Sequence, residues 1–448
     1  MNNLLIKNGL LIHADKQINE DILIRGETIQ ELGQNLTVSP DTTIIDASGK
    51  LIFPGVIDPH THMGIPIKDG SSADTFATGS RSALHGGVTT ILDFTVLGPG
   101  QTLCESLETR QKLAAESLCD VGLHINITRF EPEILDEIPL LIKKGYNSFK
   151  VFTTYEEAGM MLSYGQIEAV AKIIGENDGI LMVHSEDNET IMAASEPFSD
   201  RSETHPKYHA YARPAEAEAV AIQTLGEIST RTNCTIYIVH LNTAQGLAVA
   251  AEFPLLKVET CPHYLMLTED VYEQDDGTMF VASPPLRKQN DQDALWQGIQ
   301  NGQIHTIGSD HCPFCLADKT ADIPFQDIPN GMGGVETLFP GLLAQFIKRN
   351  IDLSLLTQLS SRNAAKIFDL DAIKGSLSVG AHADLLIIDP KASMQDWELN
   401  LDTILDWNAY AGLPAIFPET VIRRGEIVVA SGQTQSCSQG ELVVSTPS

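Results

Sequence analysis

Residues 51–62 have the sequence LIFPGVIDPHTH, an apolar run that ends in a carboxylate and two histidines. Seven more apolar runs of strand length follow it along the chain, several of them also ending in a titratable residue. Short runs of this kind are typical of strands that are buried on both faces. The eight expected strands are LIFPGVID (51–58), VTTILDF (88–94), VGLHINI (121–127), NSFKVF (147–152), GILMVH (179–184), TIYIVH (235–240), LLKVET (255–260) and IHTIGSD (304–310).

Helical patterns separate most of these runs. Examples are DTFATGSRSALHGG (74–87) and RPAEAEAVAIQTLGEIST (213–230). Eight strand–helix units over about 300 residues predict a TIM (β/α)8 barrel rather than a doubly wound sheet. No GxGxxG or GxxxxGK[ST] motif follows a strand, so nucleotide binding has no support.

The two ends of the chain resemble each other. ILIRGETI (22–29) and VIRRGEIV (421–428) share a pattern of two short strands around an Arg-Gly-Glu turn. We therefore expect them to share one small sheet. We therefore predict a composite β-sandwich domain from residues 1–52 and 371–448, and assign the (β/α)8 barrel to residues 53–370. Residues 431–448 are polar, which predicts an end that is mobile or lies over a neighbouring surface.

The composition restricts the class of protein. Hydrophobic residues make up 43% of the 448 residues and charged residues 20%, which excludes disorder as the main state. The net charge of −30 disfavours nucleic acid and anionic membranes as partners. No run approaches the roughly 18 to 20 apolar residues of a membrane helix, and the first residues carry a charged break too early for a signal peptide. Seven scattered cysteines do not suggest a disulfide framework, so we expect a cytoplasmic protein.

The active site of such a barrel lies at the carboxyl ends of its strands. His60 and His62 end the first expected strand, and their i, i+2 spacing on an extended segment places both imidazoles on one side. Further candidate ligands close four later strands. These are Lys150 on the fourth, His184 on the fifth, His240 on the sixth and Asp310 on the eighth. Imidazoles and a carboxylate that converge on one rim predict a site for zinc or a similar metal.

Each of these residues also has an ordinary structural interpretation. A single histidine at a strand end is commonly a hydrogen-bonded core residue, and Asp310 is placed to cap a helix. Lys150 is compatible with a surface lysine or a Schiff-base amine. The coincidence of all of them on separate strand ends favours the metal site.

Other candidates carry less signal. Cys312 and Cys315 have CxxC spacing without a second pair, so two ordinary cysteines beside the site are favoured over a structural zinc or redox pair. His205 and His209 fall in a polar segment, which predicts solvated side chains. His263 ends the seventh expected strand and is a candidate for a supporting or substrate-facing role.

A set of motifs resembles the cyclic-amidohydrolase branch of the amidohydrolase superfamily, with dihydropyrimidinases and D-hydantoinases as the most similar members. The resemblance covers nearly the whole chain. The motifs are PGVIDPHTHMG (54–64), SFKVFTTY (148–155), LMVHSED (181–187), YIVHLNTAQGLAVA (237–250), ETCPHYL (259–265), SPPLR (283–287), GSDHCPF (308–314) and IPNGMGGVE (328–336).

The resemblance implies two divalent metal ions, with Zn²⁺ expected and Mn²⁺ or Fe²⁺ as alternatives. One ion would be held by His60, His62 and Asp310, and the other by His184 and His240. Lys150 would be carboxylated on its amine and bridge the two ions, which explains a lysine among ligands, because an ammonium has no lone pair to offer.

The resemblance also implies a reaction, in which a metal-activated hydroxide attacks a ring amide and releases an N-carbamoyl amino acid. Asp310 would carry the proton, and Tyr155 would donate to the oxyanion, although a packed aromatic on a lid is the alternative for Tyr155. The backbone at Ser283 and Asn330 would hold the amide edge of the ring. Met63 and Phe152, with Val96 and Leu97, would line an apolar pocket. A homotetramer is implied by the resemblance alone.

The substrate ring is the least determined feature. In dihydroorotases an arginine after the HxH motif binds the substrate carboxylate, whereas here MGIPIKDGSSAD (63–74) has Lys68 as its only cation. This favours hydantoins and dihydropyrimidines. His263 stands where those enzymes usually have glutamine, and CPHYL is more typical of allantoinases and dihydroorotases, so an allantoinase or dihydroorotase-like hydrolase is the alternative. A non-catalytic scaffold, as in family members that have lost metal ligands, is a third.

Overall fold

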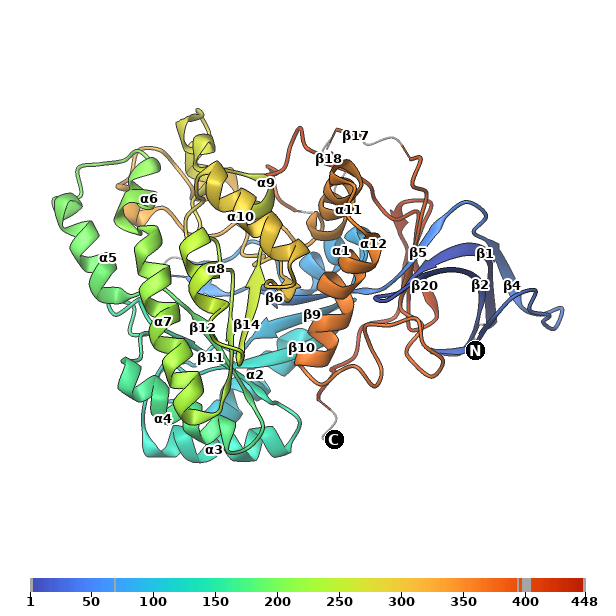
Figure 1. Cartoon of the computed structure of the whole chain (residues 1–448), viewed down its shortest axis with the longest axis horizontal. Helices are drawn as coiled ribbons and strands as arrows, with labels where there is room; N and C mark the ends of the chain where they lie inside the picture. The colour runs from blue at the N-terminus through green and yellow to red at the C-terminus, as the bar shows by residue number, and fades with distance from the viewer. Residues whose placement is uncertain (1–2, 68–69, 393–394, 397–403, 446–448) are drawn as a thin grey trace.

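The computed structural model describes residues 3–67, 70–392, 395–396 and 404–445 and contains two main sheets (Figure 1). One is an eight-stranded parallel barrel with the order β15-β14-β13-β12-β11-β10-β9-β6. Its strands are β6 (Val56–Thr61), β9 (Val88–Phe94), β10 (Asp120–Asn126), β11 (Ser148–Phe152), β12 (Ile180–His184), β13 (Thr235–Ile238), β14 (Leu256–Thr260) and β15 (Thr306–Ile307). The predicted TIM barrel is confirmed.

The ring of strands closes between its first and last members. A parallel bridge joins Thr61 at the end of β6 to His311 beyond β15, and the amide of His62 donates to the carbonyl of His311 at 2.9 Å. Nearly every residue of these strands is buried, because helices cover the outside and side chains fill the inside. The carboxyl ends of β6 and β15 are therefore held side by side.

The helices begin at residues suited to capping. Thr102 and Ser163 each form a capping box with Glu105 and Gln166, respectively, which pairs the first free amides of α2 and α4. The α-helices are α1 (Phe76–Gly86), α2 (Leu103–Ala114), α3 (Pro132–Lys143), α4 (Tyr164–Gly175), α5 (Asn188–Ser195), α6 (Lys207–Ala212), α7 (Ala215–Thr232), α8 (Ala244–Ala250), α9 (Pro262–Met266), α10 (Gln289–Gln300), α11 (Leu338–Arg349), α12 (Leu353–Thr357) and α13 (Asn363–Ile367). Short 3₁₀ turns lie at Glu196–Phe198, Glu269–Glu273, Gly277–Phe280, Leu316–Asp318 and Phe325–Asp327, and a π-helical turn at Gln358–Arg362. Among the described residues, no helix is both long and apolar enough to cross a membrane.

Strands from both ends of the chain form the second main sheet, as predicted (Figure 1). Its order is β21-β20-β19-β16-β5-β1-β2-β3, and β4 pairs with β1. The members are β1 (Asn3–Ile12), β2 (Gln17–Arg25), β3 (Thr28–Gly33), β4 (Thr43–Asp46), β5 (Leu51–Pro54), β16 (Leu385–Ile388), β19 (Thr420–Arg423), β20 (Glu426–Ala430) and β21 (Gln433–Thr434). Two small antiparallel strand pairs, β7 (Pro66–Ile67) with β8 (Gly70–Ser71) and β17 (Gln395–Asp396) with β18 (Pro414–Ala415), complete the described strands. The boundary residues of the two domains stay predictions.

The first expected strand is divided between the two sheets. Leu51–Pro54 pairs with β16 in the small sheet, and the barrel strand begins at Val56. Gly55 lies at the crossing point, where an added Cβ would stand 2.2 Å from the Thr89 hydroxyl oxygen. Glycine therefore permits the close approach of the two sheets at this position.

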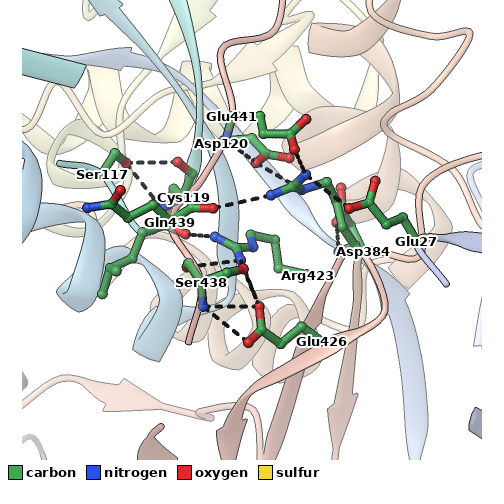
Figure 2. A network of polar contacts seen from close by, with 12 residues as sticks. Glu27, Ser117, Cys119, Asp120, Asp384, Arg423, Glu426, Ser438, Gln439 and Glu441 are labelled. Carbon is green, nitrogen blue, oxygen red and sulfur yellow. Dashed lines mark hydrogen bonds and ion pairs between the residues drawn. The ribbon is translucent and has the colours of Figure 1, made fainter. Parts of the chain in front are cut away.

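The described part of the C-terminal end lies over a neighbouring surface, which is one of the two predicted alternatives. Glu441 accepts from the amide of Val121, and Val443 donates to the carbonyl of Val121, both at 2.8 Å. The segment therefore lies along the amino end of β10. Figure 2 shows Ser438, Glu426 and Arg423 in one group of polar contacts beside it, in which the buried Arg423 guanidinium donates to the Ser438 hydroxyl at 2.8 Å.

A buried lysine connects the small sheet to the barrel. The Lys374 ammonium lies 2.5 Å from Asp120 Oδ2 and 2.6 Å from Asp384 Oδ2. Arg424 adds a second cation beside Asp120, with Nε 3.3 Å from Oδ1. Asp120, His382 and Asp384 have the spacing of a metal-ligand group, but the Lys374 ammonium already supplies the positive charge between the two carboxylates.

We predict that Lys374→Met lowers the free energy of unfolding by about 3–5 kcal/mol, because it leaves two buried carboxylates without their shared cation. Urea unfolding measures the change. The control is Lys16→Met, an exposed lysine whose replacement should change stability by less than about 0.5 kcal/mol. Equal stability of the two variants would contradict the prediction.

Candidate metal centre and active site

The structure brings the predicted ligands to the carboxyl end of the barrel. His60 lies within β6, His184 is the last residue of β12, and Lys150 lies in the middle of β11 rather than at its end. His240 and Asp310 stand two and three residues beyond β13 and β15. Strands that are separate in sequence thus present their side chains to one rim.

The first group of ligands is compact. His60 Nε2 and His62 Nε2 lie 3.2 and 3.1 Å from the same oxygen, Asp310 Oδ1. The three residues form a group of suitable spacing for one metal ion. The His60 and His62 rings are 5.0 Å apart between centroids, as expected for an i, i+2 pair on one side of a strand.

The other imidazoles continue from this group in a row. The centroid of His240 lies 5.6 Å from that of His60, and the centroid of His184 lies 4.6 Å from that of His240. Lys150 is buried nearby, with its Nζ 5.0 Å from the centre of the Phe94 ring. The six predicted ligands therefore share one region of the rim.

Three site residues hold a left-handed backbone conformation. Tyr155, His240 and Asp310 have φ values of 68°, 42° and 50°. Such a conformation is uncommon for residues other than glycine and costs about 1–3 kcal/mol where the surroundings impose it. At these positions the strands have ended, and the turn directs the side chains across the rim.

The donor atoms fit a divalent cation. Among the described residues, His60 Nε2, His62 Nδ1 and His240 Nδ1 are buried nitrogens without a hydrogen-bond partner. Burial holds the pKa of His60 and His240 well below the usual range, so these rings are neutral and keep a lone pair for a metal at neutral pH. Burial opposes ionisation of Asp310, yet His60 and His62 hold its pKa well below the usual range, which leaves a carboxylate. Neutral imidazoles with a carboxylate suit a borderline metal ion.

Comparison with known proteins identifies the family of this chain. The sequence profile of the Amidohydrolase family matches residues 51–428. A D-phenylhydantoinase of Escherichia coli O1:K1 / APEC is 35% identical over 441 residues, which cover 96% of this chain and 95% of the relative. The chain belongs to the amidohydrolase family. The predicted resemblance is confirmed.

Solved structures of family members share the whole fold. A dihydropyrimidinase from Brevibacillus agri NCHU1002 superposes with a TM-score of 0.93 at 30% identity, covering 96% of each chain. A D-hydantoinase from a Bacillus sp. AR9 gives 0.95 at 30% identity, covering 99% of this chain and 100% of that chain. An L-hydantoinase from Arthrobacter aurescens gives 0.88 at 26% identity, covering 97% and 98%.

The predicted substrate-side residues differ in their position relative to the predicted ligands. The Tyr155 ring centroid lies 4.9 Å from that of His184, and the Tyr155 hydroxyl hydrogen-bonds with Ser283. The Phe152 ring centroid is 6.1 Å from that of His184. Asn330 is exposed, whereas Met63 is fully buried beside Gly79 of α1. Lys68 lies outside the described residues.

Two buried carboxylates that the sequence analysis did not single out orient the predicted ligands. Glu259 Oε1 accepts from His60 Nδ1 at 2.7 Å and from the backbone amide of His240 at 2.9 Å. Glu186 Oε2 lies 2.7 Å from His184 Nε2 and also accepts from the Arg213 guanidinium at 2.7 Å. Burial opposes ionisation of Glu186, but Arg213 and His184 hold its pKa well below the usual range. Such partners fix the ring orientation of metal-binding histidines.

The expectation for His209 is wrong, while that for His205 fits the structure. His209 is buried, and its Nε2 donates to the carbonyl of Ala282 at 2.9 Å, beside the Ser283 hydroxyl at 3.3 Å. Helix α6 brings it under the SPPLR segment, a long-range contact with no local signal in the sequence. His205 is partly exposed, and its Nε2 lies 3.6 Å from a carboxylate oxygen of Glu273. His263 is buried at the start of α9, and its Nε2 has no hydrogen-bond partner among the described residues.

We predict that Glu259→Gln weakens Zn²⁺ affinity by about 10- to 100-fold, because the carboxylate that orients the His60 ring is lost. Competition with a chromophoric chelator measures the affinity. Glu227→Gln, at an exposed position of α7, is the matched control and should bind Zn²⁺ like the unmodified protein. Equal affinity of the two variants would show that Glu259 does not support the centre.

Proposed function

We propose that this amidohydrolase opens the ring of hydantoins and dihydropyrimidines at an amide bond and releases N-carbamoyl amino acids. The observation that carries the proposal is the convergence of the predicted ligand set with Tyr155 on one barrel rim. Relatives named D-phenylhydantoinase, 35% identical over 96% of this chain, support the choice of cyclic amides.

The proposed centre holds two divalent ions, with zinc the expected metal. His60, His62 and Asp310 would hold one ion, His184 and His240 the other, and Lys150 would bridge them as a carbamate. When bound, the ions supply Lewis acidity and lower the pKa of water. All other steps belong to side chains of the protein.

The surroundings of Lys150 favour carboxylation. Burial lowers the pKa of Lys150 to about 8, although Asp310 and Glu259 favour the ammonium. A larger fraction of the amine is therefore neutral at pH 7 than for an ordinary lysine. The neutral amine adds to carbon dioxide, forms an N–C bond and releases one proton, which converts the neutral amine into an anionic carbamate with oxygen ligands.

In ring opening, Asp310 transfers the proton and Tyr155 stabilises the negative charge. The ionised Asp310 takes a proton from the attacking water and returns it to the ring nitrogen as the C–N bond breaks. Burial raises the pKa of Tyr155 to about 12, so its hydroxyl stays protonated and donates to the oxygen that gains negative charge. The backbone at Ser283 and Asn330 would hold the amide edge of the ring.

One observation favours a second substrate. The buried Nε2 of His263 has no hydrogen-bond partner among the described residues, and burial lowers its pKa to about 4, so the ring is neutral. A substrate with an additional polar group would pair with this nitrogen. Allantoin, a hydantoin with a ureido substituent, is therefore the second candidate.

The setting of the enzyme is part of the same proposal. We infer that the protein is cytoplasmic and forms a homotetramer. The homotetramer is inferred from the family resemblance alone. All seven cysteines are free thiols, which supports a reducing compartment.

The decisive experiment compares ring-opening rates on hydantoin, 5-substituted hydantoins, dihydrouracil, allantoin and dihydroorotate, using Zn²⁺-loaded, bicarbonate-treated protein. We expect hydantoins or dihydrouracil to be preferred. Lys150→Ala should lose the metal pair and the activity, with partial rescue by a short carboxylate, whereas the control Lys172→Ala on the exposed face of α4 should keep both.

Each other result has a distinct meaning. Preference for allantoin would support the His263 argument. If none of the five substrates were hydrolysed by protein with two ions bound, the substrate class would be contradicted but not the metal centre. Protein that binds no metal after loading would support a scaffold.

We predict that Tyr155→Phe lowers kcat by about 10²- to 10³-fold, the usual cost of removing one oxyanion donor. KM should change much less, because the hydroxyl acts on charge that develops in the transition state. Steady-state kinetics on the preferred ring measure both constants. Tyr211→Phe, at an exposed position of α6, is the control. A kcat equal to that of the control would assign Tyr155 to packing only.

A further inference from the structure

Lys319 is a buried cation that neither the ligand set nor the proposed chemistry uses. Its side chain is among the largest that are fully buried, and its Nζ lies 5.7 Å from the centre of the Phe314 ring. In the described part of the chain its hydrogen-bond partners are three backbone carbonyls and no carboxylate. The charge is therefore compensated by peptide dipoles rather than by an ion pair.

The three carbonyls belong to two separate segments. Nζ donates to Met279 O at 3.1 Å, to Val281 O at 2.8 Å and to Gly331 O at 2.5 Å. The amide of Gly331 also donates to Val281 O at 3.0 Å. Residues 279–281 and residue 331 are thus joined at one point, with the Lys319 ammonium as the shared donor.

The joined segments lead directly to the substrate side of the site. Ser283 follows Val281 by two residues and lies beside Tyr155 and His209. Asn330 immediately precedes Gly331. A change in the distance between Val281 and Gly331 would therefore shift the two backbone stretches relative to each other.

Lysine is chemically suited to this task. An ammonium has three N–H donors and no acceptor, which matches three carbonyl oxygens. Burial lowers the pKa of Lys319 to about 7, and the neighbouring Cys312 acts in the opposite direction. An apolar side chain of similar length would fill the same space without the cost of burying a charge, so packing alone does not explain a lysine here.

We infer that Lys319 is a positioning residue for substrate recognition, which sets the spacing between the backbone at Ser283 and at Asn330 that grips the amide edge of the ring. This inference rests on the proposed function. Lys319 lies outside the predicted metal ligands, so its effect falls on ring binding rather than on the metal centre.

The test is a graded series at position 319 on Zn²⁺-loaded enzyme with its preferred ring. Lys319→Met removes all three hydrogen bonds, and KM should rise by about 10-fold or more while kcat changes by less than about threefold. Lys319→Gln keeps two N–H donors on a shorter side chain. Its KM should fall between that of the unmodified enzyme and that of the Met variant. Bound metal should stay at two ions per chain in both variants. Hydrogen exchange at the Gly331 amide should become faster in the Met variant.

The matched control is Lys374→Met, which also removes a buried lysine but acts far from the substrate side and should leave KM unchanged. Unchanged KM in both Lys319 variants of an active enzyme would overturn the inference alone. If the Gln variant lost bound metal, kcat and stability to the same extent as the Met variant, Lys319 would have a purely structural role. Unmodified protein that opens no ring would overturn the proposed function and this inference with it.

Discussion

The closure of the barrel between β6 and β15 is the constraint on which the site depends. The bridge from Thr61 to His311 is the contact that completes the ring, and the residues on either side of it are the first ligand group. His60 and His62 come from one side of the junction and Asp310 from the other. Because these residues are about 250 positions apart in sequence, only the closed ring brings their side chains to within 3.2 Å.

Glu259 extends this junction to the neighbouring strands. It accepts hydrogen bonds from His60, from the backbone of His240 and from the Tyr237 hydroxyl at 2.8 Å. The space it occupies is tight, since a Cβ at Gly308 would lie 2.8 Å from Glu259 Oε2. The buried Glu259 carboxylate thereby fixes the ring of His60 on β6 and the strained backbone of His240 beyond β13. Its full burial gives these contacts strength that a solvated carboxylate would lack.

The sequence was sufficient to predict the elements that repeat a local pattern. Apolar runs of six to eight residues predicted all eight barrel strands, and the i, i+2 histidines at the end of the first run predicted two side chains on one face. The division of the first run at Gly55 was missed, because both halves are equally apolar and the sheet that each joins is decided by distant strands. The observed path of residues 435–445 depends on contacts with β10, which no local pattern encodes.

The supporting residues of the site were missed for the same reason. Glu259 and His60 are 199 positions apart, and Arg213, 27 positions after Glu186, reaches it from the bend between α6 and α7. A weak signal existed for Glu259, because a charged residue near the end of an apolar strand needs a polar partner when it is buried. For His209 and Lys319 the sequence offered none, since their acceptors are backbone carbonyls, which every residue possesses.

The structure divides the site between strands and loops, and the two parts carry different information. The predicted ligands on β6, β11 and β12 are held by the closed barrel, whereas Ser283, Asn330 and Tyr155 lie on connections beyond strand ends. A barrel of this kind tolerates change in its loops far better than change in its strands. A D-hydantoinase and an L-hydantoinase accordingly superpose on this chain with TM-scores of 0.95 and 0.88. In the proposed function, the barrel strands therefore hold metal ligands, and the loop backbone at Ser283 and Asn330 contacts the ring.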